Sequence, residues 1–196
     1  MRRISVRPPQ HWQRYRWFIP TLREPARHLA GLAADGGRAA ELFDRVQANP
    51  GDEISLCVHA HLLRAPTRPV EAILVEVLGE LYRPRSATAG ADLMALFLGA
   101  ERAFLARWRS PLPGAPIYLE RLGGDRPGGP HYLTRQMAPE ALSGYERELL
   151  ALREVADRLV PEVGAGEKLR LVGHCLDGML GDVAHAIRAS EGASPA

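Results

Sequence analysis

Cysteine and lysine are scarce in this chain. Its 196 residues include two cysteines, Cys57 and Cys175, which are too few for a disulfide framework. No apolar run approaches the roughly 20 residues that a membrane-spanning helix needs, and the first residues lack the apolar core of a signal peptide. We therefore expect a reduced, cytoplasmic protein that does not enter a membrane.

Lysine occurs once, at Lys168, against 24 arginines, and the charges are unevenly distributed. Residues 1–28 contain seven arginines and a single glutamate, whereas the rest of the chain carries a net charge of −4. A basic N-terminal region thus precedes an acidic body, although the formal net charge of the whole chain is only +2.

The sequence signatures of common catalytic sites are also missing. The chain contains no Gly-x-Ser-x-Gly, no His-Glu-x-x-His, no Cys-x-x-Cys and no dinucleotide-binding fingerprint. Site residues that are scattered along a chain leave no such signature, so an enzyme stays open as an alternative.

The hydrophobic pattern predicts an α+β fold: a helix-dominated single domain with a small antiparallel sheet of about three strands. Residues 1–19 form an N-terminal arm, 20–189 the domain and 190–196 a flexible tail. Apolar spacing and breaker residues predict helices over 21–37, 38–49, 67–82, 91–108, 139–160 and 166–189. The predicted strands are 53–63, 117–122 and 131–137.

The stretch EISLCVHAHLL, residues 53–63, contains the best point candidates for a site. Its apolar residues alternate with polar ones, which is typical of a half-buried strand. On a strand, His59 and His61 project to the same side with Cα atoms about 6.5 Å apart, a spacing at which two imidazoles can share a zinc ion. Cys57 would lie about 13 Å from His61, too far to join them.

Such a zinc site needs a third ligand from a distance, for example His131 or a carboxylate. Without a metal, His59 suits a general base because an unperturbed imidazole titrates near neutral pH. The plain alternative is that these polar side chains form only the solvent-facing side of the strand.

The arm carries the strongest regional signal. In HWQRYRWF, the aromatic residues Trp12, Tyr15 and Trp17 are interleaved with Arg14 and Arg16. Arginines neutralise phosphates and aromatic rings stack on bases, so the pattern fits nucleic acid as well as a protein partner. Alternatively, the aromatic edge docks on the protein's own body.

Two further regions are weaker candidates. Loop 123–130 combines four glycines with Arg126, which could hold an anion or a partner, or merely connect two strands. On the last helix, His174 and His185 are expected on the solvent face with Asp177 and Asp182 beside them, while Cys175 packs toward the apolar side.

Two functions from different classes follow. The first is a non-enzymatic accessory or interaction subunit, without a cofactor, that uses the basic aromatic arm on a larger protein or nucleic-acid partner. The second is a small metal-dependent or general-base enzyme with its site over the 53–63 strand and zinc as its cofactor. The first is preferred because it requires no unseen third ligand or nucleophile.

Overall fold

The computed structural model of the whole chain describes residues 4–6, 18–37, 40–42, 50–106 and 137–192. These residues contain six α-helices. The helices are α1 (Arg23–Ala34), α2 (Pro50–Arg64), α3 (Val70–Tyr82), α4 (Ala87–Leu105), α6 (Pro139–Leu159) and α7 (Gly166–Gly192). A 3-10 turn, η2 (Val160–Glu162), links α6 to α7. Two short strands, β1 (Ile4–Val6) and β2 (Ala40–Leu42), pair in parallel.

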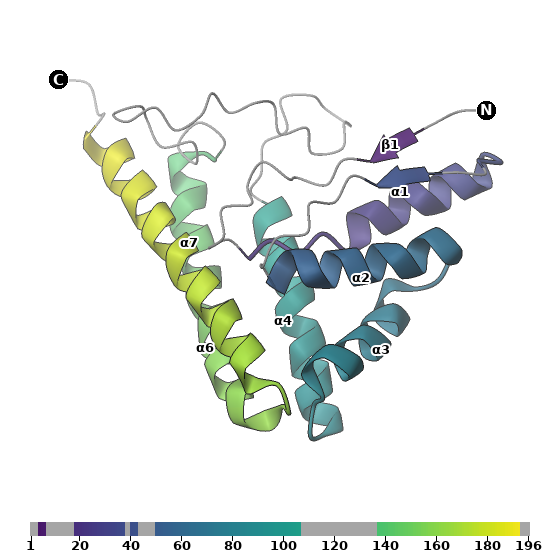
Figure 1. Cartoon of the computed structure of the whole chain (residues 1–196). Coiled ribbons are helices and arrows are strands. Elements are labelled where there is room, and N and C mark those ends of the chain that lie inside the picture. The colour runs from purple at the N-terminus through teal and green to yellow at the C-terminus, as the bar shows by residue number, and fades with distance from the viewer. Residues whose placement is uncertain (1–3, 7–17, 38–39, 43–49, 107–136, 193–196) are drawn as a thin grey trace.

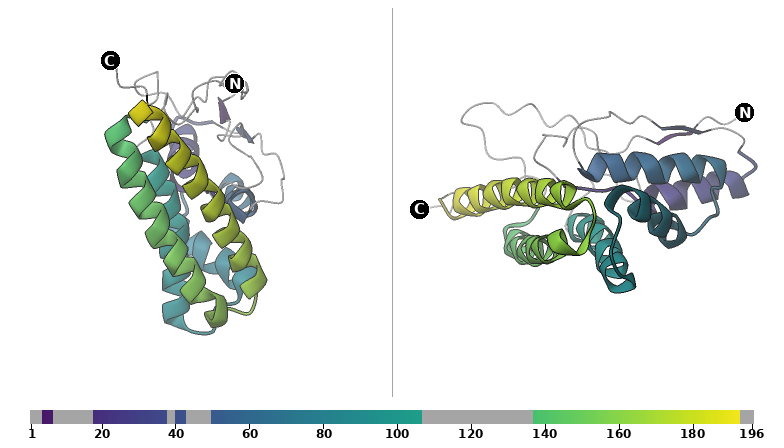
Figure 2. Two further views of the ribbon diagram at one scale, coloured as in Figure 1. Left: turned by 90° about the vertical axis from the view of Figure 1, so that its left-hand side faces the viewer. Right: turned by 60° about the horizontal axis from the view of Figure 1, so that its bottom comes forward.

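The helices form a continuous series of neighbours. α6 and α7 make an antiparallel hairpin on the left of Figure 1, and α4 packs against α6 beside it. α3 packs against α4, α2 against α3, and α1 against α2. α2 also contacts α7, which closes the series across the front of the molecule. The right-hand view of Figure 2 shows the long hairpin at one end of the molecule and α1 at the other.

An aromatic cluster lies at the centre of the core. The ring of Phe97 on α4 meets Phe18 edge-on at 5.1 Å between ring centroids and Tyr82 at 5.5 Å. All three side chains are buried. Edge-to-face contacts of this kind suit the charge distribution of aromatic rings. The cluster therefore joins the segment before α1 to the end of α3 and the middle of α4.

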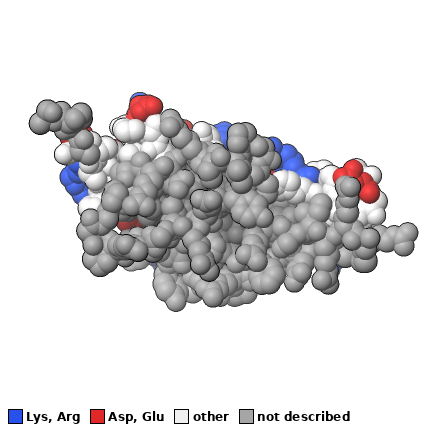
Figure 3. All heavy atoms as spheres, turned by 90° about the horizontal axis from the view of Figure 1, so that it is seen from above, with Lys and Arg blue, Asp and Glu red and all other residues white. Residues whose placement is uncertain are grey.

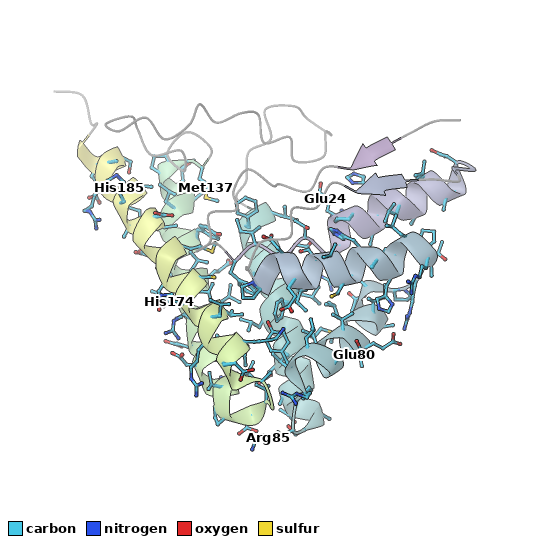
Figure 4. All side chains as sticks on the ribbon, viewed as in Figure 1. Glu24, Glu80, Arg85, Met137, His174 and His185 are labelled. Atoms are coloured by element: carbon cyan, nitrogen blue, oxygen red, sulfur yellow. The ribbon has the colours of Figure 1, made fainter. Side chains whose placement is uncertain are left out.

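Two turns are paired at the lower end of the molecule. Arg83 caps the C-terminus of α3 with a φ of 53°, and the turn that follows it lies against the turn between α6 and α7. The Arg85 amide donates to the Glu162 carbonyl at 2.9 Å, and the Gly164 amide donates to the Arg83 carbonyl at 2.9 Å. Figure 4 labels Arg85 at this end. These bonds fix the α3–α4 corner to the α6–α7 hairpin.

The predicted α+β class with three antiparallel strands is wrong. No antiparallel sheet occurs in the described residues, and β1 and β2 are parallel three-residue strands. The segment 53–63 belongs to helix α2. The predicted strand 117–122 lies outside the described residues, as does 131–137 apart from Met137, which is buried just before α6.

The strand prediction for 53–63 failed because two polar side chains are buried in place of two apolar ones. The inward face of α2 consists of Ile54, Ser55, Val58, His59 and Leu62, which follows the helical period of 3.6. Ala60 and Leu56, which were predicted to point inward, are exposed. Hydrophobicity in this segment therefore alternates with a period of two, whereas burial follows the helical period of 3.6.

Several other elements differ in their bounds from the prediction. The predicted helix 38–49 contains strand β2 at residues 40–42, and the rest of it lies outside the described residues. α7 continues through Gly192, into the segment predicted as tail. The helices predicted over 21–37, 67–82, 91–108 and 139–160 correspond to α1, α3, α4 and α6. Among the helices described, none is long and apolar enough to span a membrane.

Two glycines of α7 give a matched test of this packing. A Cβ at Gly166 would lie 2.8 Å from the Val160 carbonyl oxygen, whereas a Cβ at Gly181 would meet nothing within 4 Å. We expect Gly166→Ala to lower the free energy of unfolding by about 1–3 kcal/mol. Gly181→Ala should raise it by about 0.5–1 kcal/mol, because alanine loses less backbone entropy in a helix. Urea denaturation of both variants measures the two changes, and an equal effect of both would contradict the described η2–α7 junction.

Candidate functional site

His59 lies inside the protein, against the segment that leads into α1. Its side chain is 1% exposed, and its Nε2 atom lies 2.9 Å from the Thr21 carbonyl oxygen. Because that carbonyl can only accept, the Nε2 atom carries the proton of this hydrogen bond. The imidazole thus connects α2 to the backbone just before α1. The strand prediction placed it on the solvent-facing side, and the structure places it in the interior.

Ser55 lies one turn before His59 on α2 and binds the amide of the same residue, Thr21. The Ser55 hydroxyl accepts a hydrogen bond from the Thr21 amide at 2.9 Å and donates one to the Gly51 carbonyl at 2.6 Å. Ser55 and His59 therefore bind the N–H and the C=O of Thr21. These bonds allow two polar side chains to be buried without leaving a peptide group unsatisfied.

Glu101 of α4 completes this polar centre by capping α1. Its Oε1 atom accepts from the Leu22 amide at 2.5 Å and from the Arg23 amide at 2.9 Å, and its Oε2 atom lies 3.2 Å from the Arg23 amide. α1 has no side-chain cap from its own N-cap residue, Leu22. A carboxylate from another helix therefore satisfies the amides that a helix start leaves unpaired, at the positive end of the helix dipole.

Burial opposes the charge on this carboxylate. Glu101 is 3% exposed, and the loss of hydration raises the pKa of its carboxyl group above the ordinary value for glutamate. The amides of Leu22, Arg23 and Glu24 and the charge of Arg23 lower the pKa, but by less than burial raises it. We call Thr21, Ser55, His59 and Glu101 the polar clamp, because together they hold the start of α1.

The helix separates His59 from His61 and brings His61 toward Cys57. Residues two apart on a helix point about 200° apart, so His61 does not share the side of His59 and is half-buried. Glu53, Cys57 and His61 instead follow one another at four-residue spacing. Burial, and then the charge of Glu53, raises the pKa of the Cys57 thiol, so this thiol is not an activated nucleophile.

The zinc site was predicted on a strand, and the structure has a helix at that segment. Within the described ranges, no group of three or more His, Cys, Asp or Glu side chains is arranged to hold a metal ion. His131, the suggested third ligand, lies outside those ranges. The two histidines belong to opposite sides of α2 and do not form a chelating pair.

The histidines of α7 lie where the sequence predicted. His174 and His185 are exposed along the outer side of the helix, as Figure 4 shows. Cys175 is 1% exposed, and burial followed by the charge of Asp52 raises the pKa of its thiol to about 11. Asp177 is exposed and pairs with Arg153 at 2.7 Å, whereas Asp182, predicted beside it on the solvent face, is buried.

An open groove of about 550 Å³ lies between α1 and the connection from α2 to α3. One wall is a face of α1 with Arg23, Ala26, Arg27 and Ala30, and the other is the segment 66–71. The Arg23 side chain donates from its Nη2 atom to Glu71 Oε1 at 2.6 Å across the groove. Both elements lie on the right of Figure 1. The sequence prediction did not identify this groove, since its walls come together only in the fold.

The other predicted site residues lie outside the described part of the chain. They are Trp12, Arg14, Tyr15, Arg16 and Trp17 of the arm and Arg126 of the glycine-rich loop. The two residues that end the arm are described: Phe18 is buried, and Ile19 is half-buried against the core.

Glu101 is the buried functional group that sequence reasoning missed. It stands in the apolar stretch ALFLGAERAFLARW, and a lone carboxylate there is a recognisable signal, because a buried acid requires donors. The signal does not reveal which helix start supplies them. The partner amides lie 78 and 79 residues earlier in the chain.

The two histidines of α2 test whether His59 is structural. We expect His59→Ala to lower the free energy of unfolding by about 2–4 kcal/mol, because it leaves a cavity and an unpaired Thr21 carbonyl. His61→Ala, at a half-buried position on the same helix, should change it by less than 1 kcal/mol. Urea denaturation compares them, and equal stability of the two variants would refute the polar clamp.

Glu101 predicts a specific pH dependence of stability. Its folded-state pKa is raised, so its favourable contribution is present below the unfolded pKa and is lost as pH rises through the folded pKa. Glu101→Gln has no such loss, so its free energy of unfolding should increase relative to that of the wild type as pH rises above the ordinary pKa of glutamate. Glu154→Gln, at an exposed site on α6, controls for the change in net charge. A difference in unfolding free energy between Glu101→Gln and the wild type that does not vary with pH would contradict the buried position of Glu101.

Comparison with protein families, with curated proteins and with solved structures finds no match to this chain.

Proposed function

We propose that this protein is a non-enzymatic accessory or interaction subunit. It uses the basic aromatic arm, with Trp12, Arg14, Tyr15, Arg16 and Trp17, to bind a larger protein or nucleic-acid partner. The observation that carries the proposal is the attachment of the arm to the body. Buried hydrogen bonds from three different helices hold the end of the arm and the residues directly after it.

Each bond of this attachment holds one residue of the segment 18–22. The Phe18 amide points at the Met179 sulfur of α7 at 3.1 Å, the Thr21 amide donates to Ser55 of α2, and the Leu22 amide donates to Glu101 of α4. Phe18 and Leu22 are 1% and 0% exposed. The arm therefore starts from a fixed point on the body, and a fixed origin reduces the entropy lost when an attached segment binds.

The composition of the arm supplies the recognition chemistry. Two of the three tryptophans of the chain lie within six residues, together with two arginines. Tryptophan, tyrosine and arginine are the residue types that contribute most to binding at protein interfaces. The same residues bind single-stranded nucleic acid through stacking and phosphate contacts.

The described geometry gives the enzyme alternative no support. Its site was predicted on a strand, and that segment is helix α2. His59, its proposed base, is buried and bonded to a backbone carbonyl. We therefore do not carry this alternative further.

The arm is tested by substitution in the full-length chain. We expect a variant with Arg14→Glu and Arg16→Glu to lose at least nine-tenths of the partner recovered from cell extract by the tagged wild-type protein. Quantitative mass spectrometry and nucleic-acid staining of the eluates measure the loss, and nuclease treatment distinguishes the two partner classes. A nucleic-acid partner also predicts binding that weakens steeply with salt.

A matched control reverses two arginines of the body. Arg147→Glu with Arg170→Glu changes the net charge equally at exposed positions of α6 and α7. This control should retain the partner. Equal recovery by the wild type and the arm variant would refute the proposed function, and equal loss from both variants would attribute binding to net charge alone.

A further inference from the structure

We infer that the groove between α1 and the α2–α3 connection binds an acidic segment of a protein partner, in which carboxylates flank an apolar side chain. The inference rests on the proposed function and specifies the chemistry of its partner. The charges and the shape of the groove support this inference.

Three arginines stand around the groove. Arg23 and Arg27 project from successive turns of α1, and Arg68 projects from the opposite wall. One carboxylate, Glu71, is also part of the lining. The lining therefore has an excess of positive charge, which attracts acidic groups and increases their rate of encounter with the groove.

The ion pairs leave one arginine available. Arg23 pairs with Glu71, and Arg68 pairs with Glu76 on the next turn of α3. Arg27 is exposed and forms no ion pair among the described residues. A carboxylate that enters the groove can bind Arg27 directly, with two parallel hydrogen bonds from the guanidinium group. A second carboxylate can replace Glu71 at Arg23, since that ion pair is exposed to solvent.

Apolar residues form part of both walls of the groove. Ala26 and Ala30 have short side chains, so the groove reaches close to the backbone of α1. Pro66 and Pro69 restrict the backbone of the opposite wall, which also contains the buried Val70. This surface suits an aliphatic side chain between two carboxylates. The volume of about 550 Å³ falls within the usual range for ligand sites, about 300–1,000 Å³.

The same details disfavour a nucleic acid as the occupant. A phosphate backbone has no aliphatic group to pack on Ala26, Ala30 and Val70 of the lining. No aromatic side chain is among the groove-lining residues, so bases have no ring to stack on. Seen from above, the described part of the surface shows basic and acidic side chains in separate groups (Figure 3).

The groove also continues the basic region of the chain. Arg23 and Arg27 are the last two arginines of the strongly basic segment 1–28. The polar clamp fixes the start of α1, so the groove and the origin of the arm are held by the same helix. A partner that is bound by the arm is therefore close to the groove, which raises the effective concentration of its acidic segment.

The test uses the full-length protein and a fluorescein-labelled ten-residue peptide of glutamate, aspartate, leucine and alanine. Fluorescence anisotropy at low salt should show binding, and the peptide with glutamine and asparagine in place of its acids should not bind. Arg27→Glu should weaken binding at least tenfold. Ala30→Trp, which fills the groove without altering charge, should weaken it to a similar extent. Arg170→Glu, the matched charge control on α7, should change it less than twofold.

Several results would overturn the inference. They are the absence of peptide binding by the wild type, an equal loss in Arg27→Glu and Arg170→Glu, full binding by Ala30→Trp, or displacement of the peptide by a single-stranded DNA oligonucleotide of equal charge. Circular dichroism and urea denaturation check that each variant is folded. If Arg27→Glu loses the peptide but the arm variant keeps the partner, the proposed function fails and the groove stands. If the arm variant loses the partner but Arg27→Glu binds the peptide normally, only the groove assignment fails.

Discussion

The hydrogen bonds between the Glu101 carboxylate and the first amides of α1 determine much of this structure. They place an ionisable side chain of α4 inside the protein, where burial opposes its charge, and they connect two helices that do not follow each other in the chain. Removing the carboxylate would leave the amides of Leu22 and Arg23 without their acceptor. The start of α1, and with it the direction of the preceding chain, therefore depends on one residue of α4.

Ser55 and His59 extend this dependence to α2. They bind the amide and the carbonyl of Thr21, so two consecutive peptide units before α1 are satisfied by side chains from other elements. A segment without regular structure can be buried only when its polar groups find such partners. This requirement explains why the interior of a helical protein contains a serine, a histidine and a glutamate around one short stretch of backbone.

The fold was partly predictable from the sequence, and the failure at α2 has a physical cause. Helices α3, α4 and α6 have apolar faces with the period of 3.6 and were predicted near their observed positions. α2 was predicted as a strand because Ser55 and His59 occupy its buried face while Leu56 and Ala60 are exposed. Hydrophobicity indicates burial only where buried groups are apolar, and here the buried polar groups depend on backbone partners that the local sequence does not identify. The groove was equally hidden, because its walls are about 40 residues apart in the chain.

Arg23 connects the polar clamp to the groove. Its amide donates to Glu101 in the interior, and its guanidinium group donates to Glu71 at the surface. The first bond fixes where α1 begins and, through the helical repeat, where Arg27 and Ala30 lie on the groove wall. The second bond places a carboxylate of this chain where an acidic ligand would bind. The inner bond thus gives the groove its geometry, while the outer bond makes binding a competition between two carboxylates for one arginine, which favours ligands that also engage Arg27.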